Sequence, residues 1–316
     1  MARSRYAPDR GLTARMTVTM FLLGLVFVAF IGLIIGIGAA THGSTDVIAL
    51  FAVVLGGGML IGSLFYSDKI AMRTAGAVEV SPAQAPELHG IVDRICALAD
   101  MPKPRVAIAR SNMPNAFATG RNADHAVICV TTGLMDGRLT NEELEGVLAH
   151  EMSHVAHKDV TVMTVASFLA IIAGLMVRMA FYSELFGGGR RNNNNQNAAM
   201  MMFAIMAVSI VVYAVSFLLI RVLSRYRELA ADRSGALLTG QPSALKSALI
   251  KVSSDIGRIP QQDLRTAESM NAFYFAPAMS LRGGGGASLS KIFSTHPTLE
   301  RRLAELDKIQ QQLNQR

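Results

Sequence analysis

Four long apolar runs divide the chain into membrane-like and water-soluble stretches. Residues 16–40 contain no charged side chain, and residues 47–66 form a second run after a short polar linker. About 20 residues suffice to cross a bilayer core of about 30 Å, so these two runs predict a transmembrane hairpin. The runs at 160–177 and 198–220 predict a second hairpin. For this second pair, a buried or interfacial hairpin of the soluble part stays open as an alternative.

The stretches between these runs have the patterns of a soluble domain. Pro86 to Leu98 has apolar residues at helical spacing, and the C-terminal residues 299–313 show the same periodicity with a charged face. Three runs rich in strand-forming residues predict β-strands at 106–110, 115–119 and 125–131. We therefore expect a mainly α fold with a small β-sheet and four candidate transmembrane helices.

This pattern predicts four successive parts of the chain. The second hairpin interrupts one soluble domain, so that the two halves of the domain come together in space. The parts are an N-terminal tail with a transmembrane hairpin (1–66), the first half of the soluble domain (67–159), the second hairpin (160–220) and the second half of the soluble domain (221–316).

Composition and charge support a membrane protein. Hydrophobic residues make up 51% of the chain and charged residues 17%, whereas about 25% charged is usual for soluble proteins. The net charge of +7 comes largely from arginines and lysines that flank the apolar runs. We interpret this charge as a topology signal and an attraction to anionic lipid, and we expect no nucleic-acid partner. The separated Cys96 and Cys129 predict buried, inert thiols.

The flanking charges also predict an orientation. Positive residues favour the cytoplasmic side of a membrane. Such residues precede the first run at Arg3, Arg5, Arg10 and Arg15, and follow the fourth at Arg221, Arg225 and Arg227. Arg190 and Arg191 lie in the opposite loop and oppose this trend. The balance places both termini and the soluble domain in the cytoplasm.

A short motif carries the chemistry. Residues 150–154 read His-Glu-Met-Ser-His, an HExxH pattern. On a helix, His150 and His154 lie one turn apart and face one point, where neutral imidazoles suit Zn²⁺. Glu151 lies between them, turned away by about 100° per residue, where it can reach a water molecule as a base. Thr140 and Glu143 predict a capping box at the start of this helix.

A catalytic zinc site usually has three protein ligands and one open position. His157 is seven residues from His150, about 10.5 Å along a helix, which is too far to share the ion. Asp159 is a poor candidate because it lies at the start of an apolar run, where we expect it to cap a helix or to bind backbone groups. Glu228 is the best third ligand, and Asp232, one turn later, could hydrogen-bond a ligand imidazole.

These motifs resemble those of the bacterial HtpX family of membrane zinc metalloproteases, which are related to the Ste24 proteases. The likeness rests on HEMSH, the downstream ELAAD, two apolar runs before and two after HExxH, and the late His296-Pro297. It implies a cytosolic zincin-like protease domain with one Zn²⁺ per chain and a catalytic glutamate. The implied ligands are His150, His154 and Glu228, with Glu151 as the catalytic residue.

Two further positions follow from the same resemblance. Asn115 opens NAFATG, which is similar to the edge strand beside the cleft of the relatives, and could donate to the reacting carbonyl. Its alternative is a turn residue that enters a strand. His296 could stabilise the oxyanion, whereas Pro297 suggests a rigid turn with a structural histidine. Arg302 is interpreted as an ion-pair anchor of the last helix.

The resemblance implies a heat-shock-associated enzyme of membrane-protein quality control. It would cleave damaged or misassembled membrane proteins on the cytoplasmic side of the bacterial inner membrane. Two alternatives stay open: a dedicated processing protease of prenyl-peptide type, and a membrane adaptor with a structural zinc held by four ligands. The expected partners are membrane-protein substrates and the lipid bilayer, and the oligomeric state is not assigned.

Overall fold

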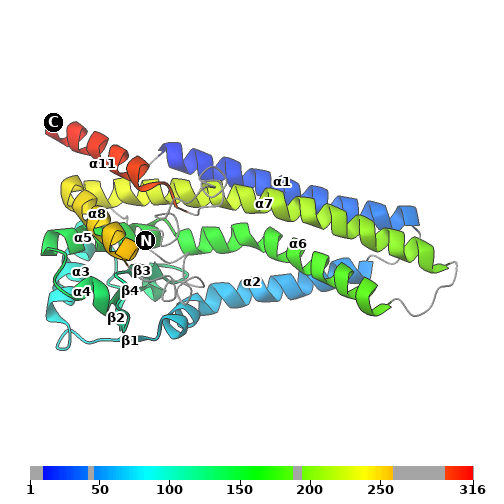
Figure 1. Cartoon of the computed structure of the whole chain (residues 1–316), viewed down its shortest axis with the longest axis horizontal. Helices are drawn as coiled ribbons and strands as arrows, with labels where there is room; N and C mark the ends of the chain where they lie inside the picture. The colour runs from blue at the N-terminus through cyan, green and yellow to red at the C-terminus, as the bar shows by residue number, and fades with distance from the viewer. Residues whose placement is uncertain (1–9, 42–45, 188–193, 259–295, 316) are drawn as a thin grey trace. The chain divides into compact units, whose positions relative to one another are not determined.

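The computed structural model describes residues 10–41, 46–187, 194–258 and 296–315 (Figure 1). Its longest elements are helices, and four short strands form one sheet, which confirms the predicted fold class. The helices before the sheet are α1 (Arg10–Thr41) and α2 (Asp46–Ala75). The sheet region contains β1 (Ala77–Glu79), α3 (Pro86–Ala99), β2 (Arg105–Ala109), β3 (Ala116–Thr119), η1 (Ala123–His125), β4 (Val127–Thr131) and α4 (Thr132–Met135). The later helices are α5 (Asn141–Ala156), α6 (Asp159–Gly187), α7 (Asn194–Thr239), α8 (Pro242–Arg258) and α11 (Leu299–Asn314).

The chain divides into two compact units. We call them the sheet unit, which comprises Met1–Thr13, Leu64–Thr161 and Ser224–Arg316, and the long-helix unit, which comprises Ala14–Ser63 and Val162–Leu223. Both units therefore contain segments that are distant in sequence. The four-part boundaries expected from the sequence stay a prediction.

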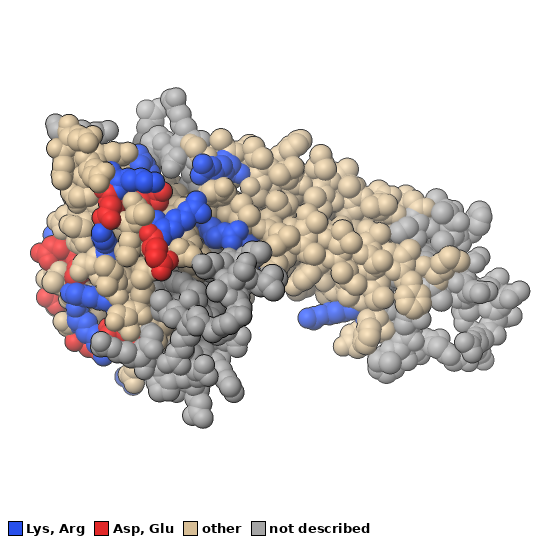
Figure 2. Space-filling view, turned by 45° about the horizontal axis from the view of Figure 1, so that its top comes forward, with Lys and Arg blue, Asp and Glu red and all other residues tan. Residues whose placement is uncertain are grey.

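The long-helix unit is apolar both inside and outside. Its core brings together α1, α6 and α7, which contribute side chains such as Phe30, Ile172 and Ile205. Other large apolar side chains of α1 and α7 are exposed, among them Phe21, Val28 and Val211. A helix that is apolar all round is typical of a membrane span. In the space-filling view the long helices show almost no charged surface (Figure 2).

Three of the predicted apolar runs lie in helices long and apolar enough to cross a membrane. These segments are Thr13–Gly36, Asp159–Arg178 and Phe203–Thr239, within the part of the chain that the structure describes. The second predicted run, 47–66, lies in α2, but the side chains of residues 47–53 are outside the described set. Its crossing of a membrane therefore stays a prediction.

The sheet has the strand order β1-β2-β4-β3. β2 and β4 pair in parallel, with Arg105 opposite Val127, and β3 pairs antiparallel with β4, with Ala116 opposite Val130. The three predicted strands are thus confirmed, and β1 is an addition at the other edge. β3 lies at one end of the strand order, next to α5.

Both faces of the sheet are covered. On one face, Val106, Ile128 and Val130 join the main core with residues of α3, α5 and α8. On the other, Phe117 and Cys129 pack with the small Ala71 near the end of α2. Alternate residues of β4 therefore supply both cores, as the period of two of a strand requires. This double packing explains why all five residues of β4 are buried.

Two helix boundaries position the residues of HExxH and ELAAD. The HExxH helix, α5, ends at Ala156, and Lys158 has a left-handed φ of 56°. The fourth apolar run and the following ELAAD segment form one uninterrupted helix, α7, of 46 residues. No proline interrupts α7, so its backbone hydrogen bonds continue from apolar into polar sequence.

Candidate metal centre

The capping box at the start of α5 is confirmed. The Thr140 side chain accepts from the Glu143 N–H, and the Glu143 carboxylate accepts from the Thr140 N–H at 2.8 Å. The Ser247 hydroxyl and the Lys251 ammonium, both from α8, also donate to Glu143, at 2.6 and 2.7 Å. These contacts fix where α5 begins and which face it buries. That face carries His150, which has no exposed surface.

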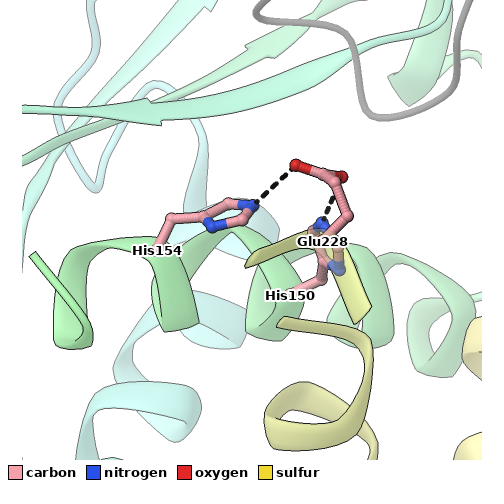
Figure 3. Close-up of side chains that lie close together, drawn as sticks. All are labelled: His150, His154 and Glu228. Atoms are coloured by element: carbon pink, nitrogen blue, oxygen red, sulfur yellow. Dashed lines mark ion pairs between the residues drawn. The ribbon is translucent and has the colours of Figure 1, made fainter. Parts of the chain in front are cut away.

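α7 brings the predicted third ligand to this face. The Glu228 carboxylate lies between the two imidazoles, with Oε2 3.7 Å from His150 Nε2 and Oε1 3.6 Å from His154 Nε2 (Figure 3). All three side chains are buried. One ligand atom from each residue lies within 4.8 Å of the others. The structure thus brings together the three residues that the sequence analysis grouped.

This donor set fits a divalent metal ion. Ligand atoms about 2.0–2.2 Å from a tetrahedral Zn²⁺ lie about 3.3–3.6 Å from one another. The separations of 3.6 and 3.7 Å from Glu228 to the two histidines are close to that range. They exceed the usual N–H···O hydrogen-bond length of about 2.7–3.2 Å. Two imidazoles and one carboxylate also form a donor set typical of catalytic zinc.

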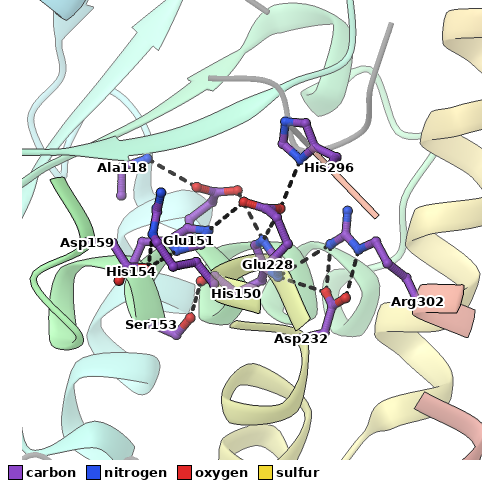
Figure 4. A network of polar contacts seen from close by, with 11 residues as sticks. Ala118, His150, Glu151, Ser153, His154, Asp159, Glu228, Asp232, His296 and Arg302 are labelled. Atoms are coloured by element: carbon purple, nitrogen blue, oxygen red, sulfur yellow. Dashed lines mark hydrogen bonds and ion pairs between the residues drawn. The ribbon is translucent and has the colours of Figure 1, made fainter. Parts of the chain in front are cut away.

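A buried carboxylate stands behind His150. Asp232 Oδ1 lies 2.9 Å from His150 Nδ1, so Nδ1 carries a proton, and Nε2 is the nitrogen that faces Glu228 (Figure 4). Arg302 of α11 donates twice to Asp232, from Nε at 2.7 Å and Nη2 at 2.6 Å. Both members of this pair are buried. The carboxylate therefore fixes the tautomer of His150, and the arginine fixes the carboxylate.

The field at His150 favours positive charge. Burial lowers the pKa of His150, but the carboxylates of Asp232 and Glu228 outweigh burial and raise the pKa to about 9. A site that attracts a proton in this way also attracts a metal cation, because both respond to the same negative potential. The types of ligand atom and the negative potential at the site therefore both favour a bound cation.

Glu151 lies beside the three candidate ligands, on the side of the sheet. One carboxylate oxygen accepts from the Ala118 N–H of β3 at 3.3 Å, and the other lies 4.0 Å from His150 Nε2 (Figure 4). Burial raises the pKa of Glu151, although the two histidines and the Ala118 N–H oppose this. A raised pKa makes the carboxylate a stronger base once it is ionised.

The two further positions that the resemblance implied, His296 and Asn115, lie in different surroundings. His296 is buried, and its Nδ1 is 3.1 Å from Glu228 Oε2, so it contacts the candidate metal ligand directly (Figure 4). Asn115 is buried just before β3, where its N–H donates to Thr131 Oγ1 and its carbonyl accepts from the Thr131 N–H, both at 2.9 Å. Their roles in oxyanion stabilisation stay predictions.

The partners of two residues near the site escaped the sequence analysis. Asp159 was expected to cap a helix or bind backbone, but its Oδ2 lies 2.6 Å from His154 Nδ1 and 3.0 Å from Arg227 Nε. Arg302 was expected to anchor its helix, and its partner is Asp232, 70 residues away. The carboxylate five residues after His154 was the available signal for the contact with Asp159. The free thiols of Cys96 and Cys129 are buried, as predicted, and burial raises their pKa values to about 11 and 12.

A glycine on α7 permits the close approach of the two ligand-bearing helices. A Cβ at Gly235 would lie 2.9 Å from the His150 N atom and 3.1 Å from its Cα. These neighbours are backbone atoms, so they cannot rotate away. Gly235 is seven residues after Glu228, on the same helix face. The glycine therefore sets the distance between the α5 and α7 backbones at the site.

We expect Gly235→Ala to destabilise the protein by about 1–3 kcal/mol, the usual cost of overpacking. The shift of α7 should also weaken metal binding, because it moves Glu228 away from the histidines. Thermal unfolding and metal titration of the purified full chain measure both effects. Gly90→Ala is the matched control, since Gly90 lies in α3 with open space around its Cβ position. Equal behaviour of the two variants would contradict the packing argument.

Comparison with known proteins places this site in a family. The model of peptidase family M48 matches residues 82–310. A protease HtpX homologue of Streptomyces coelicolor is 55% identical over 313 residues, covering 99% of this chain and 97% of the relative. A protease HtpX homologue of Moorella thermoacetica is 49% identical over 314 residues and covers 99% of both chains.

A solved structure extends the likeness to the fold. The crystal structure of S. mikatae Ste24p matches with a TM-score of 0.51 at 18% identity, covering 95% of this chain and 67% of that one. The full-length sequence matches confirm the resemblance stated from the motifs, and the metal cluster agrees with a metallopeptidase. By its matched residues and its full-length relatives, the chain belongs to peptidase family M48, as a membrane metalloprotease of the HtpX type.

Proposed function

We propose that this protein is a zinc-dependent endopeptidase that cleaves damaged or misfolded membrane proteins on the cytoplasmic side of the membrane. The observation that carries the proposal is the buried cluster of His150, His154 and Glu228, with Glu151 beside it. The apolar helices and the names of the relatives support membrane association and proteolysis. Membrane-protein quality control, the stress response and the inner-membrane location are parts of the proposal.

In this proposal His150, His154 and Glu228 hold one Zn²⁺. When bound, the ion supplies Lewis-acid chemistry, because it lowers the pKa of water to about 7 and polarises a carbonyl. Asp232 holds the His150 proton on Nδ1, at 2.9 Å, so Nε2 is the nitrogen that would donate its lone pair to the ion. The ligand set leaves a coordination position for the reactants, because three protein donors occupy only part of a tetrahedron.

Glu151 takes the proton of the attacking water and later passes it to the leaving amine. Its position one residue after His150 and its hydrogen bond with Ala118 support this role. The bond directs one carboxylate oxygen toward β3 and leaves the other near the histidines. His296 and Asn115 are assigned roles at the oxyanion, and the contact of His296 with Glu228 also supports a role in orienting that ligand.

The structural-zinc alternative is less well supported. It requires four protein ligands and no open position. Among the described residues, the cluster that could hold a metal ion contains three residues, His150, His154 and Glu228. His296 lies outside this cluster, and its Nδ1 contacts the Glu228 carboxylate. This arrangement favours an open, catalytic site over a closed one.

The test uses membrane-protein reporters in vesicles that contain the full-length protease. One reporter carries an unfolded segment on the cytoplasmic face, and a second carries the same segment on the opposite face. We expect cleavage of the first reporter only, by the wild type and not by Glu151→Gln. Equal cleavage of both reporters, or cleavage by Glu151→Gln, would refute the proposal. A folded version of the first segment is the control for selectivity toward damage.

A further inference from the structure

The second histidine of the motif has a buried carboxylate of its own. His154 Nδ1 lies 2.6 Å from Asp159 Oδ2, and the Asp159 side chain is only 1% exposed (Figure 4). A carboxylate at this nitrogen binds its proton and leaves Nε2 as the lone-pair donor. That Nε2 is the atom that faces Glu228 Oε1 at 3.6 Å.

The contact depends on a break between α5 and α6. In an unbroken helix, a residue five positions after His154 would lie about 7.5 Å further along the axis and about 140° around it. Instead, the Lys158 N–H donates to the Val155 carbonyl, only three residues back, and Lys158 adopts a left-handed φ of 56°. Such a conformation is uncommon without glycine. It turns the chain so that Asp159, the first residue of α6, points back to His154.

An arginine from α7 completes this arrangement. Arg227 Nε lies 3.0 Å from Asp159 Oδ2, and its side chain is 12% exposed. Arg227 immediately precedes the candidate ligand Glu228. One turn of α7 therefore supplies both the candidate ligand Glu228 and the arginine that pairs with Asp159, the carboxylate behind His154.

The same arrangement occurs behind the first histidine, with other residues. Asp232 lies 2.9 Å from His150 Nδ1, and Arg302 lies 2.6 Å from Asp232. Each histidine of the motif is thus backed by a buried carboxylate, and each carboxylate is paired with an arginine from a different helix. Burying such ion pairs costs free energy, because both charges lose their hydration. Two of them at one site therefore indicate a functional role in addition to packing.

We propose that Asp159 and Arg227 are positioning residues for the metal, and form the support of His154 that corresponds to Asp232 and Arg302 at His150. Asp159 sets the tautomer and direction of the His154 ring, and Arg227 holds the carboxylate in place. This inference rests on the proposed zinc site. In this arrangement Asp159, the first residue of α6, and Arg227, on the turn of α7 that carries Glu228, both support the candidate ligand His154.

The test measures zinc affinity of the purified full chain by competition with a chromophoric chelator. Asp159→Ala should weaken binding about 10–100-fold, the usual effect of losing such a partner. The zinc affinity of Asp159→Asn should fall less, because its amide oxygen can still accept from the His154 Nδ1–H. The zinc affinity of Arg227→Met should lie between those of the wild type and Asp159→Ala. Asp136→Asn is the matched control, since its ion pair with Arg138 is exposed and 3.5 Å long. This control should bind zinc as the wild type does.

A second measurement separates positioning from general stability. At saturating Co²⁺, the visible absorption spectrum reports the ligand geometry, so Asp159→Asn should shift it, whereas Asp136→Asn should superimpose on the wild type. If Asp159→Ala binds zinc with wild-type affinity, the inference is overturned and the proposed function stays intact. If the alanine variant does not fold, wild-type affinity and an unchanged spectrum in Asp159→Asn lead to the same conclusion. A wild-type protein that binds no zinc would overturn both.

Discussion

Glu151→Gln is expected to reduce peptide hydrolysis by about 10²–10⁴-fold, the usual contribution of a general base, with the zinc content unchanged. Glutamine has nearly the same shape as glutamate, and its amide oxygen can still accept from the Ala118 N–H, which Glu151 binds at 3.3 Å. The variant should therefore fold and hold the metal, but it cannot take a proton from water. Cleavage rate and zinc per chain are measured on the same preparation.

A matched exchange on the same helix controls for a general effect of removing a carboxylate. Glu142 lies in the first turn of α5 and is exposed, so Glu142→Gln should keep wild-type activity. Undiminished cleavage by Glu151→Gln would refute the assigned base. Loss of zinc together with activity in that variant would instead make Glu151 part of the metal-binding set.

Removal of the metal should abolish hydrolysis, and addition of Zn²⁺ should restore it. The three candidate ligands are buried imidazoles and a carboxylate, a set that suits Zn²⁺ better than Mg²⁺ or Ca²⁺, which prefer oxygen ligands. Mg²⁺ and Ca²⁺ should therefore fail to restore activity. Glu228→Gln should stay inactive at stoichiometric zinc, because a neutral amide is a weak ligand.

The control for this experiment is Glu300→Gln, an exposed carboxylate in the first turn of α11. It should recover with zinc as the wild type does. Activity that persists in protein shown to contain no metal would contradict a metal-dependent mechanism. Full recovery of Glu228→Gln at stoichiometric zinc would remove Glu228 from the ligand set.

Much of the site could be predicted because helical spacing encodes it. His150, Glu151 and His154 lie within two turns, and the capping box of Thr140 sets where that helix begins. Glu228 could be found because it lies on a helical stretch just after the fourth apolar run, with Asp232 one turn later on the same face. Local periodicity thus identified the helices and the three residues that the structure brings together.

The contact of Asp232 with a ligand imidazole was predicted, but two other contacts behind the ligands could not be, for separate physical reasons. The turn that brings Asp159 to His154 depends on a left-handed Lys158, a conformation that no glycine marks in the sequence. The Arg302–Asp232 pair joins residues 70 positions apart, so only the packing of α11 creates it. The same limit applies to the sheet, where the parallel pairing of β2 with β4 arises from a connection that passes through β3.

The central claim is that His150, His154 and Glu228 hold a catalytic zinc ion with an open position. X-ray absorption at the zinc edge of the purified wild-type protein tests it most directly. We expect two imidazole ligands and a remaining shell of oxygen at about 2.0–2.2 Å, with no sulfur at about 2.3 Å. A third imidazole, which would place His296 in the coordination shell, or a sulfur ligand from a cysteine would contradict it.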